Sequence, residues 1–192
     1  MTGQAMSGMS EQRLLRAAYH HLARYATNRH GLSRVLERKL RRAADGAAPD
    51  ADARACIDRV CARCAELGLL DEQAYAQGRA ETLMRRGAGT RRIAQDLAAR
   101  GVPEAVVQTV LANLAHAAAD AGGPDWQAAI ALARRKRLGP FAAVPLDPED
   151  AAAWRRALGV FARAGIGYEI AQAVLRASDP DALEVVREDG MD

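Results

Sequence analysis

The sequence is poor in aromatic residues and in the residues that build strands. Phe, Trp and Tyr make up 4% of its 192 residues, and much of its 49% hydrophobic content is Ala. Ala is the best helix former, whereas the β-branched and aromatic residues that favour strands are sparse. No segment shows a sustained alternation of apolar and polar residues. The composition therefore predicts an all-α fold and argues against a β-sandwich.

Long apolar runs are also absent. The longest uncharged stretch, 105–119, is shorter than a membrane span and carries Gln108, Asn113 and His116. Residues 1–12 are polar and small, without the apolar central region of a secretory signal. We therefore expect a cytoplasmic protein with no membrane segment.

Cysteine is scarce, but two of the three cysteines have the spacing of a functional motif. Cys61 and Cys64 have the spacing of a redox or zinc motif, with Cys56 nearby. A structural zinc needs four ligands, and the chain has no second CxxC motif or local His pair; a thioredoxin-like site would need a βαβ context. Cys61 also aligns with Val110 and Val174 in the repeats described below. We expect three buried apolar cysteines and no metal or other cofactor.

Catalytic patterns are missing as well. His20 and His21 are adjacent and so point to different faces, and no Ser/His/Asp or paired-carboxylate arrangement can be found. The turn from Gly87 to Gly89 lacks the Lys-Ser/Thr that follows in a phosphate loop, so Gly87 is expected to end a helix. Trp126 and Trp154 are interpreted as packing residues. We expect no catalytic residue and a protein that is not an enzyme.

Arginine is what the sequence has in excess. The net charge is +3, and the only lysines are Lys39 and Lys136. The planar guanidinium suits phosphate and carboxylate groups, which favours nucleic acid or an acidic protein groove as partner. A GC-rich genome, which supplies Arg and Ala codons, explains the bias equally well but does not explain where the Arg residues cluster.

A helical unit recurs along the chain. The stretch 85–111 matches the stretch that lies 64 residues further on, so that Arg91 aligns with Arg155, Leu97 with Phe161 and Gly101 with Gly165. Shifted back by 57 residues, Arg91 aligns with Arg34. Tandem recurrence is the signature of a repeat architecture.

The repeats define the expected organisation: three tandem three-helix repeats that form an elongated, curved array. The domains are a disordered tail (1–10), repeat 1 (11–68), repeat 2 (69–120), repeat 3 (121–177) and an acidic, mobile tail (178–192). In repeat 1, 28–31 is expected to end the first helix, and the second is expected to run over 32–44. Repeat 2 is expected to open with a helix, capped by Asp71, that buries Ala74, Tyr75, Gly78 and Leu83.

At this level of detail the chain resembles a known family. The matching residues are Gly68-Leu69-Leu70-Asp71-Glu72 with Tyr75-Ala76, Arg86-Gly87, Arg91-Arg92-Ile93, 97–102, Ala164-Gly165-Ile166 and Tyr168-Glu169-Ile170. In this order and spacing they resemble the RecX family of recombinase regulators over roughly residues 14–176. One departure is Leu32, at a position where a capping Ser is common in repeat 1.

The resemblance implies a protein that lies in the groove of the RecA filament on single-stranded DNA. It implies contact with neighbouring RecA subunits, and inhibition of the ATPase, strand exchange and filament extension. It places the protein in homologous recombination, DNA repair and the SOS response. Weak, sequence-independent contact with single- or double-stranded DNA is a second option, and a monomer is expected.

The positions of the arginines suggest which surface would contact RecA or DNA. Arg34, Arg91 and Arg155 each stand two positions before a residue expected to be buried, which turns their side chains about 200° away from it. Three stacked repeats would then present a row of guanidinium groups, extended by clusters at helix ends. The expected partner-binding residues, here called the basic set, are Arg34, Arg38, Arg41, Arg42, Arg85, Arg86, Arg91, Arg92, Arg134, Arg135, Lys136, Arg137, Arg155 and Arg156.

Two other functions stay open at this point. A helix-turn-helix-like protein that binds DNA without RecA would place its recognition helix in the major groove, and Thr90-Arg91-Arg92 is the candidate start of such a helix. A helical scaffold with some other partner is the third hypothesis.

Overall fold

The structure of the chain is a computed structural model that describes residues 10–147, 149–181 and 183. The predicted N-terminal tail up to residue 9, and residues 182 and 184–192 of the predicted acidic tail, lie outside this part of the chain.

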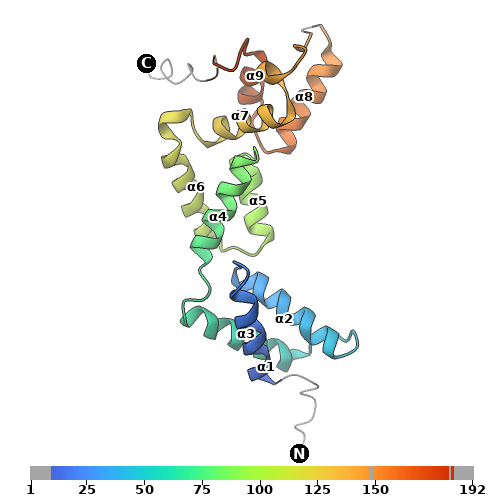
Figure 1. The fold of residues 1–192 in the computed structure, drawn as a ribbon, viewed down its shortest axis with the longest axis vertical. Coiled ribbons are helices and arrows are strands. Elements are labelled where there is room, and N and C mark those ends of the chain that lie inside the picture. The colour runs from blue at the N-terminus through green and yellow to red at the C-terminus, as the bar shows by residue number, and fades with distance from the viewer. Residues whose placement is uncertain (1–9, 148, 182, 184–192) are drawn as a thin grey trace, which may run out of the picture. The chain divides into compact units, whose positions relative to one another are not determined.

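The described residues form helices and contain no strand, which confirms the predicted all-α class (Figure 1). Two short 3-10 turns, η1 and η2, accompany the α-helices. The elements are α1 (Glu11–Leu22), α2 (Arg29–Ala43), α3 (Ala51–Glu66), α4 (Glu72–Arg85), α5 (Thr90–Ala99), α6 (Glu104–Ala117), η1 (Ala119–Ala121), α7 (Pro124–Lys136), η2 (Gly139–Phe141), α8 (Ala151–Arg163) and α9 (Tyr168–Arg176).

The helices gather into two compact units. Unit 1 contains α1 to α3, the start of α4 up to Tyr75, and the tripeptide 100–102 between α5 and α6. Unit 2 contains the rest of α4 from Ala76, α5, and the chain from Pro103 through α9. The division into three repeats stays a prediction; α4 is divided between the two units, whereas α5 and α6 belong to unit 2.

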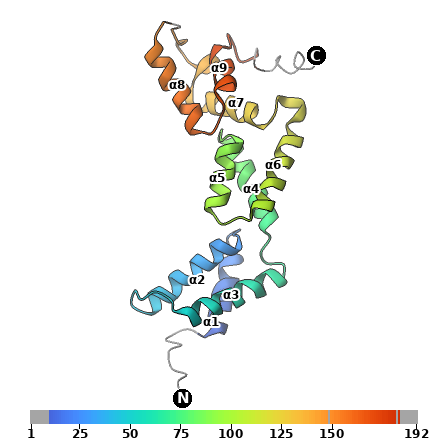
Figure 2. The ribbon, with the colours of Figure 1, turned by 180° about the vertical axis from the view of Figure 1, so that it is seen from behind.

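Unit 1 is held by an apolar core between three helices. Helix α3 packs against both α1 and α2, which Figures 1 and 2 show from opposite sides. Leu14, Leu36, Ile57 and Val60 are at most 1% exposed. Burying each such side chain contributes about 1.5–3 kcal/mol to the folded state. These four apolar side chains therefore form part of the core of this unit.

The start of α2 differs from the prediction. Helix α1 already ends at Leu22, and Asn28 caps α2 because its Oδ1 accepts a hydrogen bond from the Gly31 N–H at 2.9 Å. The predicted helix end at 28–31 is therefore wrong, and Leu32 lies inside α2 and is fully buried. Asn28 is itself 1% exposed, and its Nδ2 donates to the Arg100 carbonyl at 2.9 Å. One amide thus caps a helix and ties the 100–102 tripeptide into unit 1.

Replacing Asn28 separates these two roles. Asn28→Ala loses the cap, worth about 1 kcal/mol, and the donor to the Arg100 carbonyl, worth about another 1 kcal/mol. Asn28→Ser keeps a capping oxygen but cannot reach Arg100, so it should lose only about half as much. Urea unfolding measures both variants. Equal losses for the two would show that the cap contributes nothing.

Unit 2 has its core between α7, α8 and α9. Phe161 and Val174 are fully buried there, with Leu132 and Ile166 beside them. Leu183 belongs to the same core. It is 2% exposed, and its carbonyl accepts a hydrogen bond from the Trp126 indole at 3.3 Å. The packed part of the chain therefore includes Leu183, a residue that the sequence places in a mobile tail.

The inward face of α4 also differs from the prediction. Ala76 and Ala80 are fully buried, whereas Ala74 and Gly78 are exposed. The predicted face is therefore rotated from the true one. The buried positions of α4 are small alanines, and the sequence pattern gives Ala no more weight than Tyr or Leu.

Glycines in the α4–α5 turn allow backbones to meet within unit 2. Gly87 has φ +82°, and a Cβ there would lie 2.7 Å from the backbone of Leu132 in α7. The Gly89 N–H donates to the Ala164 carbonyl at 2.8 Å, at the corner between α8 and α9. A Cβ on Gly165 in that corner would lie 2.6 Å from the Arg92 nitrogen. These contacts join α4 and α5 to α7 and α8 without any large side chain between them.

Gly87 ends α4, as predicted. Its N–H donates to the Met84 carbonyl at 2.8 Å, and the Ala88 N–H donates to Leu83 at 3.0 Å. This pair of bonds is a Schellman motif, which satisfies the last carbonyls of a helix and needs a residue with positive φ.

Candidate partner-binding surface

All fourteen residues of the basic set are exposed. Each of the three repeated Arg positions stands two residues before a buried one: Leu36 and Ile93 are fully buried, and Ala157 is 4% exposed. The helical geometry that turns these Arg side chains outward is therefore present in α2, α5 and α8. Whether the residues bind a partner stays a prediction.

Arg91 and Arg92 lie in the first turn of α5, which a neighbouring helix holds in place. The Thr90 N–H donates to the Asp125 carboxylate of α7 at 2.6 Å, and the Ile93 N–H closes the first turn on the Gly89 carbonyl at 3.0 Å. A carboxylate at a helix N-terminus is favourable because it faces the positive end of the helix dipole. The contact with α7 thus holds in place the first turn of α5, which carries Arg91 and Arg92.

Arg155 and Arg156 stand in the first turns of α8. Asp150 caps this helix, accepting hydrogen bonds from Ala152 at 3.0 Å and Ala153 at 2.8 Å, and lies 4.0 Å from the Arg156 guanidinium. Arg155 lies eight residues before Arg163, the last residue of α8, which is about 12 Å along the helix. Arg155 is therefore well separated, along α8, from the corner that contacts Arg92.

The basic cluster at the end of α7 is ordered by its own turn. Arg137 has φ +54°, and the Leu138 N–H donates to the Ala133 carbonyl at 2.9 Å. The Arg134 guanidinium carbon lies 5.3 Å from the centre of the Phe141 ring in η2. Such a cation–π contact is worth about 0.5–1 kcal/mol at an exposed site. Cations at a helix C-terminus are also stabilised by the helix dipole. The mutual repulsion within this cluster therefore lowers the stability of the fold only slightly.

The remaining members lie on α2 and at the end of α4. Arg34 and Arg38 belong to unit 1, whereas Arg91 and Arg155 belong to unit 2. Arg85 donates to the Thr82 hydroxyl at 3.1 Å within α4. The structure thus brings each cluster to the surface of its own unit, and the continuous row across the repeats stays a prediction.

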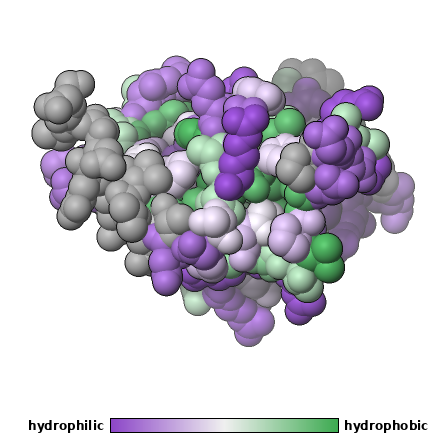
Figure 3. All heavy atoms as spheres, turned by 90° about the horizontal axis from the view of Figure 1, so that it is seen from above, coloured by the Kyte–Doolittle hydropathy of each residue, from purple (hydrophilic) through white to green (hydrophobic). Residues whose placement is uncertain are grey.

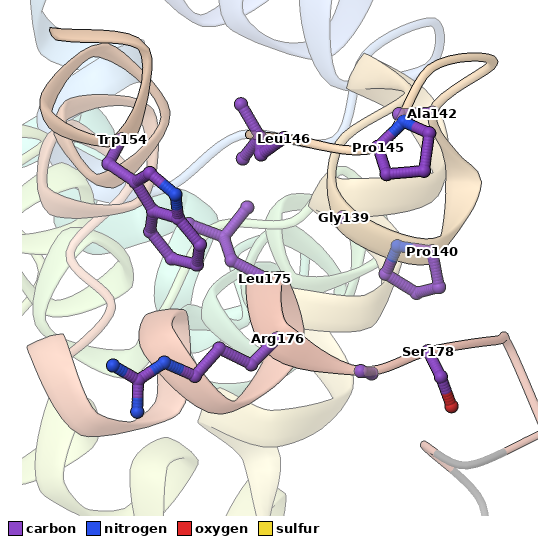
Figure 4. A pocket seen from close by; sticks show the side chains of 10 residues that line it. Gly139, Pro140, Ala142, Pro145, Leu146, Trp154, Leu175, Arg176 and Ser178 are labelled. Atoms are coloured by element: carbon purple, nitrogen blue, oxygen red, sulfur yellow. The ribbon is translucent and has the colours of Figure 1, made fainter. Parts of the chain in front are cut away.

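A pocket of about 410 Å³ opens in unit 2 between α8, α9 and the Pro-rich loop. In Figure 4 the side chains of Trp154, Leu146 and Leu175 lie around one space, with Pro140 and Pro145 on another side of it. The Trp154 indole donates to the Asp147 carbonyl at 3.1 Å and so packs the loop against α8. Trp126 is 8% exposed and belongs to the core. Both Trp residues pack within unit 2, as the sequence analysis predicts.

The face of the protein shown in Figure 3 is mixed in hydropathy. Figure 3 shows hydrophilic side chains projecting around exposed hydrophobic atoms on the face seen from above. Within the described ranges, no group of three or more His, Cys, Asp or Glu side chains is arranged to hold a metal ion. None of the helices described here combines the length and apolar character that a bilayer crossing requires.

The three cysteines are buried thiols in the core of unit 1. Cys56, Cys61 and Cys64 are at most 1% exposed, as predicted. Burial raises the pKa of Cys61 to about 11 and also raises the pKa of Cys64. For Cys56 burial and then the Glu11 carboxylate raise the pKa. Because the thiolate is the reactive form, these residues are poor nucleophiles and poor metal ligands at neutral pH.

Alkylation kinetics test this assignment. Raising the pKa of Cys61 from 9.0 to about 11 lowers its thiolate fraction at pH 8 by about 100-fold, and its alkylation by iodoacetamide should slow at least as much. The same chain in urea is the control. The raised pKa stabilises the fold below pH 9, and this stability is lost as the pH rises further, because only the unfolded thiol then ionises. Rapid alkylation of the native protein would contradict the assignment.

One basic site was missed by the sequence analysis. A pocket in unit 1 is lined by Arg13, Arg16, Ala17, His20 and Lys39, of which the basic set contains none. The available signal was the spacing of three basic residues three and four positions apart on α1, which puts them on one helix face. The repeat comparison did not reveal it, because it gave weight only to positions that recur.

Comparison with known proteins shows which family this chain resembles. The model of the second three-helix domain of RecX matches residues 71–111. A regulatory protein RecX from Myxococcus xanthus is 38% identical over 160 residues, which cover 83% of this chain and 82% of the relative. Another, from Halorhodospira halophila, is 34% identical over 117 residues, or 61% of this chain and 65% of the relative. An identity of this level over most of both chains, on an all-helical fold, shows that the chain belongs to the RecX family of regulatory proteins.

Proposed function

We propose that this protein regulates the RecA recombinase by binding the RecA filament on single-stranded DNA through the basic set. The observation that carries the proposal is the exposure of all fourteen cations in a member of this regulatory family. Exposed Arg side chains offer planar, multi-donor groups that pair with carboxylates or phosphates along a filament groove.

The proposed mechanism needs only binding. A chain of rigid helices whose cations contact neighbouring RecA subunits would hold those subunits in one relative arrangement. Any ligand that favours one state of the filament shifts the filament towards it by its differential affinity. A RecA arrangement that hydrolyses ATP slowly and adds subunits poorly would account for inhibition of ATPase, strand exchange and extension. Such a regulator works as a cytoplasmic monomer without catalysis of its own.

Co-sedimentation with preformed RecA filaments on single-stranded DNA tests the binding step. The protein should pellet with the filament, and binding should weaken as salt rises because exposed charges are screened over about 8–10 Å. Absence of the protein from the filament pellet at low salt would contradict the proposal.

Binding to duplex DNA, measured without RecA, separates the alternative functions. A helix-turn-helix-like protein would use the exposed first turn of α5, with Arg91 and Arg92, to read duplex DNA without RecA. Tight, sequence-dependent duplex binding in the absence of RecA would therefore favour that function. Capture of neither RecA nor DNA would favour a scaffold with another partner.

A further inference from the structure

Leu183 anchors the last described part of the chain in unit 2. It is 2% exposed and belongs to the core of that unit. Its N–H donates to the Pro180 carbonyl at 3.2 Å, and its carbonyl accepts a hydrogen bond from the Trp126 indole at 3.3 Å. Residues 184–192, here called the C-terminal segment, lie outside the described residues. They follow directly on this anchor, which Trp126 fixes beside the first turn of α7.

The anchor is close to the first turn of α5. Asp125, the neighbour of Trp126 in the chain, accepts a hydrogen bond from the Thr90 N–H at 2.6 Å. Consecutive Cα atoms are about 3.8 Å apart, so Leu183 and Thr90 are bound by adjacent residues of α7. The nine residues of the C-terminal segment reach up to about 30 Å when extended. The segment is therefore long enough to pass over the start of α5.

Four exposed cations lie around this end of α5. Arg85 and Arg86 precede the turn between α4 and α5, and Arg91 and Arg92 follow it. These four residues are here called the α4–α5 cluster. The turn between them, 87–89, is buried against α7 and the α8–α9 corner. The cluster is therefore held beside α7, the same helix that holds the anchor.

The acids closest to the cluster along α4, α5 and α7 are engaged with other groups. Asp96 forms a bidentate pair with Arg79, with both distances 2.9 Å. Glu81 accepts a hydrogen bond from the Gln77 amide at 2.9 Å, and Asp125 binds the first turn of α5. Among the described residues, no member of the cluster forms an ion pair. The four guanidinium groups are therefore available to an acidic ligand.

The C-terminal segment has the charge of such a ligand. It contains four acids and one base, a net charge of −3, and these residues are Glu184, Arg187, Glu188, Asp189 and Asp192. A short tether gives a segment an effective concentration in the millimolar range at a nearby site. Exposed ion pairs are individually weak, so a contact made of a few of them is also readily displaced. Charge and tether together match the segment to the α4–α5 cluster.

We propose that the C-terminal segment binds the α4–α5 cluster of its own chain and competes there with the filament. The contact itself needs no RecA, whereas its effect on filament binding rests on the proposed function. The acids of the segment take the place of the carboxylates or phosphates that the same cations bind in a partner. A filament therefore has to displace the segment, which weakens its binding to the cluster.

A second basic cluster in unit 2 lies farther from the anchor. It begins at Arg134, eight residues or about 12 Å along α7 from Trp126. The Arg134 guanidinium also lies over the Phe141 ring, at 5.3 Å from its centre. The start of α5, by contrast, is hydrogen-bonded to the residue next to Trp126. The position of the anchor therefore favours the α4–α5 cluster over the end of α7.

A nitroxide spin label on the C-terminal segment tests the contact without RecA. Gly190→Cys supplies a thiol for labelling in the full chain, and the three native cysteines are buried and react poorly. At low salt the label should broaden the backbone amide NMR signals of residues 85–92, relative to the same sample with the label reduced. The broadening should be lost as salt rises, because exposed charges are screened over about 8–10 Å. It should also be lost when Glu188→Gln/Asp189→Asn is added.

Filament co-sedimentation tests the competition. The Glu188→Gln/Asp189→Asn variant should bind the RecA filament about three- to tenfold more tightly at low salt, since the weak ion pairs of a tethered segment no longer oppose binding. In the Arg91→Glu/Arg92→Glu background the same change should alter binding by less than about twofold, because the segment is then repelled from the start of α5.

Asp52→Asn/Asp58→Asn makes the same change in net charge at exposed positions of unit 1 and is the matched control. An equal gain in this control would overturn the competition, because binding would then follow net charge alone. Absence of broadening at 85–92, or stronger broadening at 134–137, would overturn the contact. Broadening at 85–92 with unchanged filament binding would support the contact and contradict the role of the cluster in the filament, so the two failures are distinguishable.

Discussion

The Arg91→Glu/Arg92→Glu variant should bind the RecA–DNA filament about ten- to a hundredfold more weakly than the unchanged protein. Each tenfold corresponds to 1.4 kcal/mol. Reversing a charge both removes an attraction and adds a repulsion against the same acidic or phosphate group. The loss should be largest at low salt and shrink as salt rises, because both side chains are exposed.

The fold should survive this change. Both side chains lie in the first turn of α5, where acidic residues interact favourably with the helix dipole. Helicity and melting temperature should therefore stay the same. Arg54→Glu/Arg163→Glu makes the same change in net charge at exposed positions outside the basic set. If this control weakened filament binding equally, the start of α5 would have no specific role in binding. A loss of helicity in the first variant would show that the side chains of Arg91 and Arg92 are not directed outward.

Gly165→Ala should destabilise unit 2 by about 3 kcal/mol, or roughly 6–12 °C in melting temperature for a chain of this size. Gly165 has φ +81°, where a side chain costs about 1–2 kcal/mol, and its new Cβ would lie 2.6 Å from the Arg92 nitrogen. Moving that backbone apart costs about another 1–3 kcal/mol. Trp126 and Trp154 both lie in unit 2, so Trp fluorescence reports the unfolding of this unit.

Gly68→Ala is the matched control for the strain alone. Gly68 has φ +67°, but a Cβ there would meet nothing within 4 Å. It should cost only the backbone penalty of about 1–2 kcal/mol. Because Gly68 lies in unit 1, far-UV circular dichroism is the appropriate signal for it. A loss for Gly165→Ala no larger than that for Gly68→Ala would show that the α8–α9 corner does not contact α5 closely.

The features that the sequence could predict are those governed by local periodicity. Helical spacing placed Leu36, Ile93 and Ala157 inside and the repeated Arg positions outside, because a residue two positions from a buried one points to the other face. The cap at Asp71 follows from the same local chemistry, since its carboxylate accepts a hydrogen bond from the Ala74 N–H, three residues on, at 2.8 Å.

The features that were missed depend on contacts between distant segments. Asn28 looked like the end of a helix, because the same residue types serve at turns and at caps. Its bond to Arg100 bridges 72 positions, which no local pattern shows. Likewise, Gly89 and Gly165 gave no hint of meeting each other. The buried face of α4 was missed because it consists of the small residues Ala76 and Ala80, and the hydrophobic pattern does not distinguish a buried Ala from an exposed one.

The basic pocket of unit 1 was missed for a different reason. Arg16 and Lys39 come from two helices, so their proximity is a property of tertiary packing. The spacing along α1 indicates one basic face, but a basic face is ordinarily solvated surface. Only the packing of α1 against α2 places a fourth cation beside the other three.

The rate of ATP hydrolysis by RecA on single-stranded DNA, measured while this protein is added, tests the central claim most directly. The claim is that the basic set binds the filament and that binding restrains RecA. We expect the rate to fall and then level off as the filament becomes saturated, and the Arg91→Glu/Arg92→Glu variant to require at least about ten times more protein, or 1.4 kcal/mol, for the same effect. An unchanged rate at saturating protein, with no protein in the filament pellet, would contradict it.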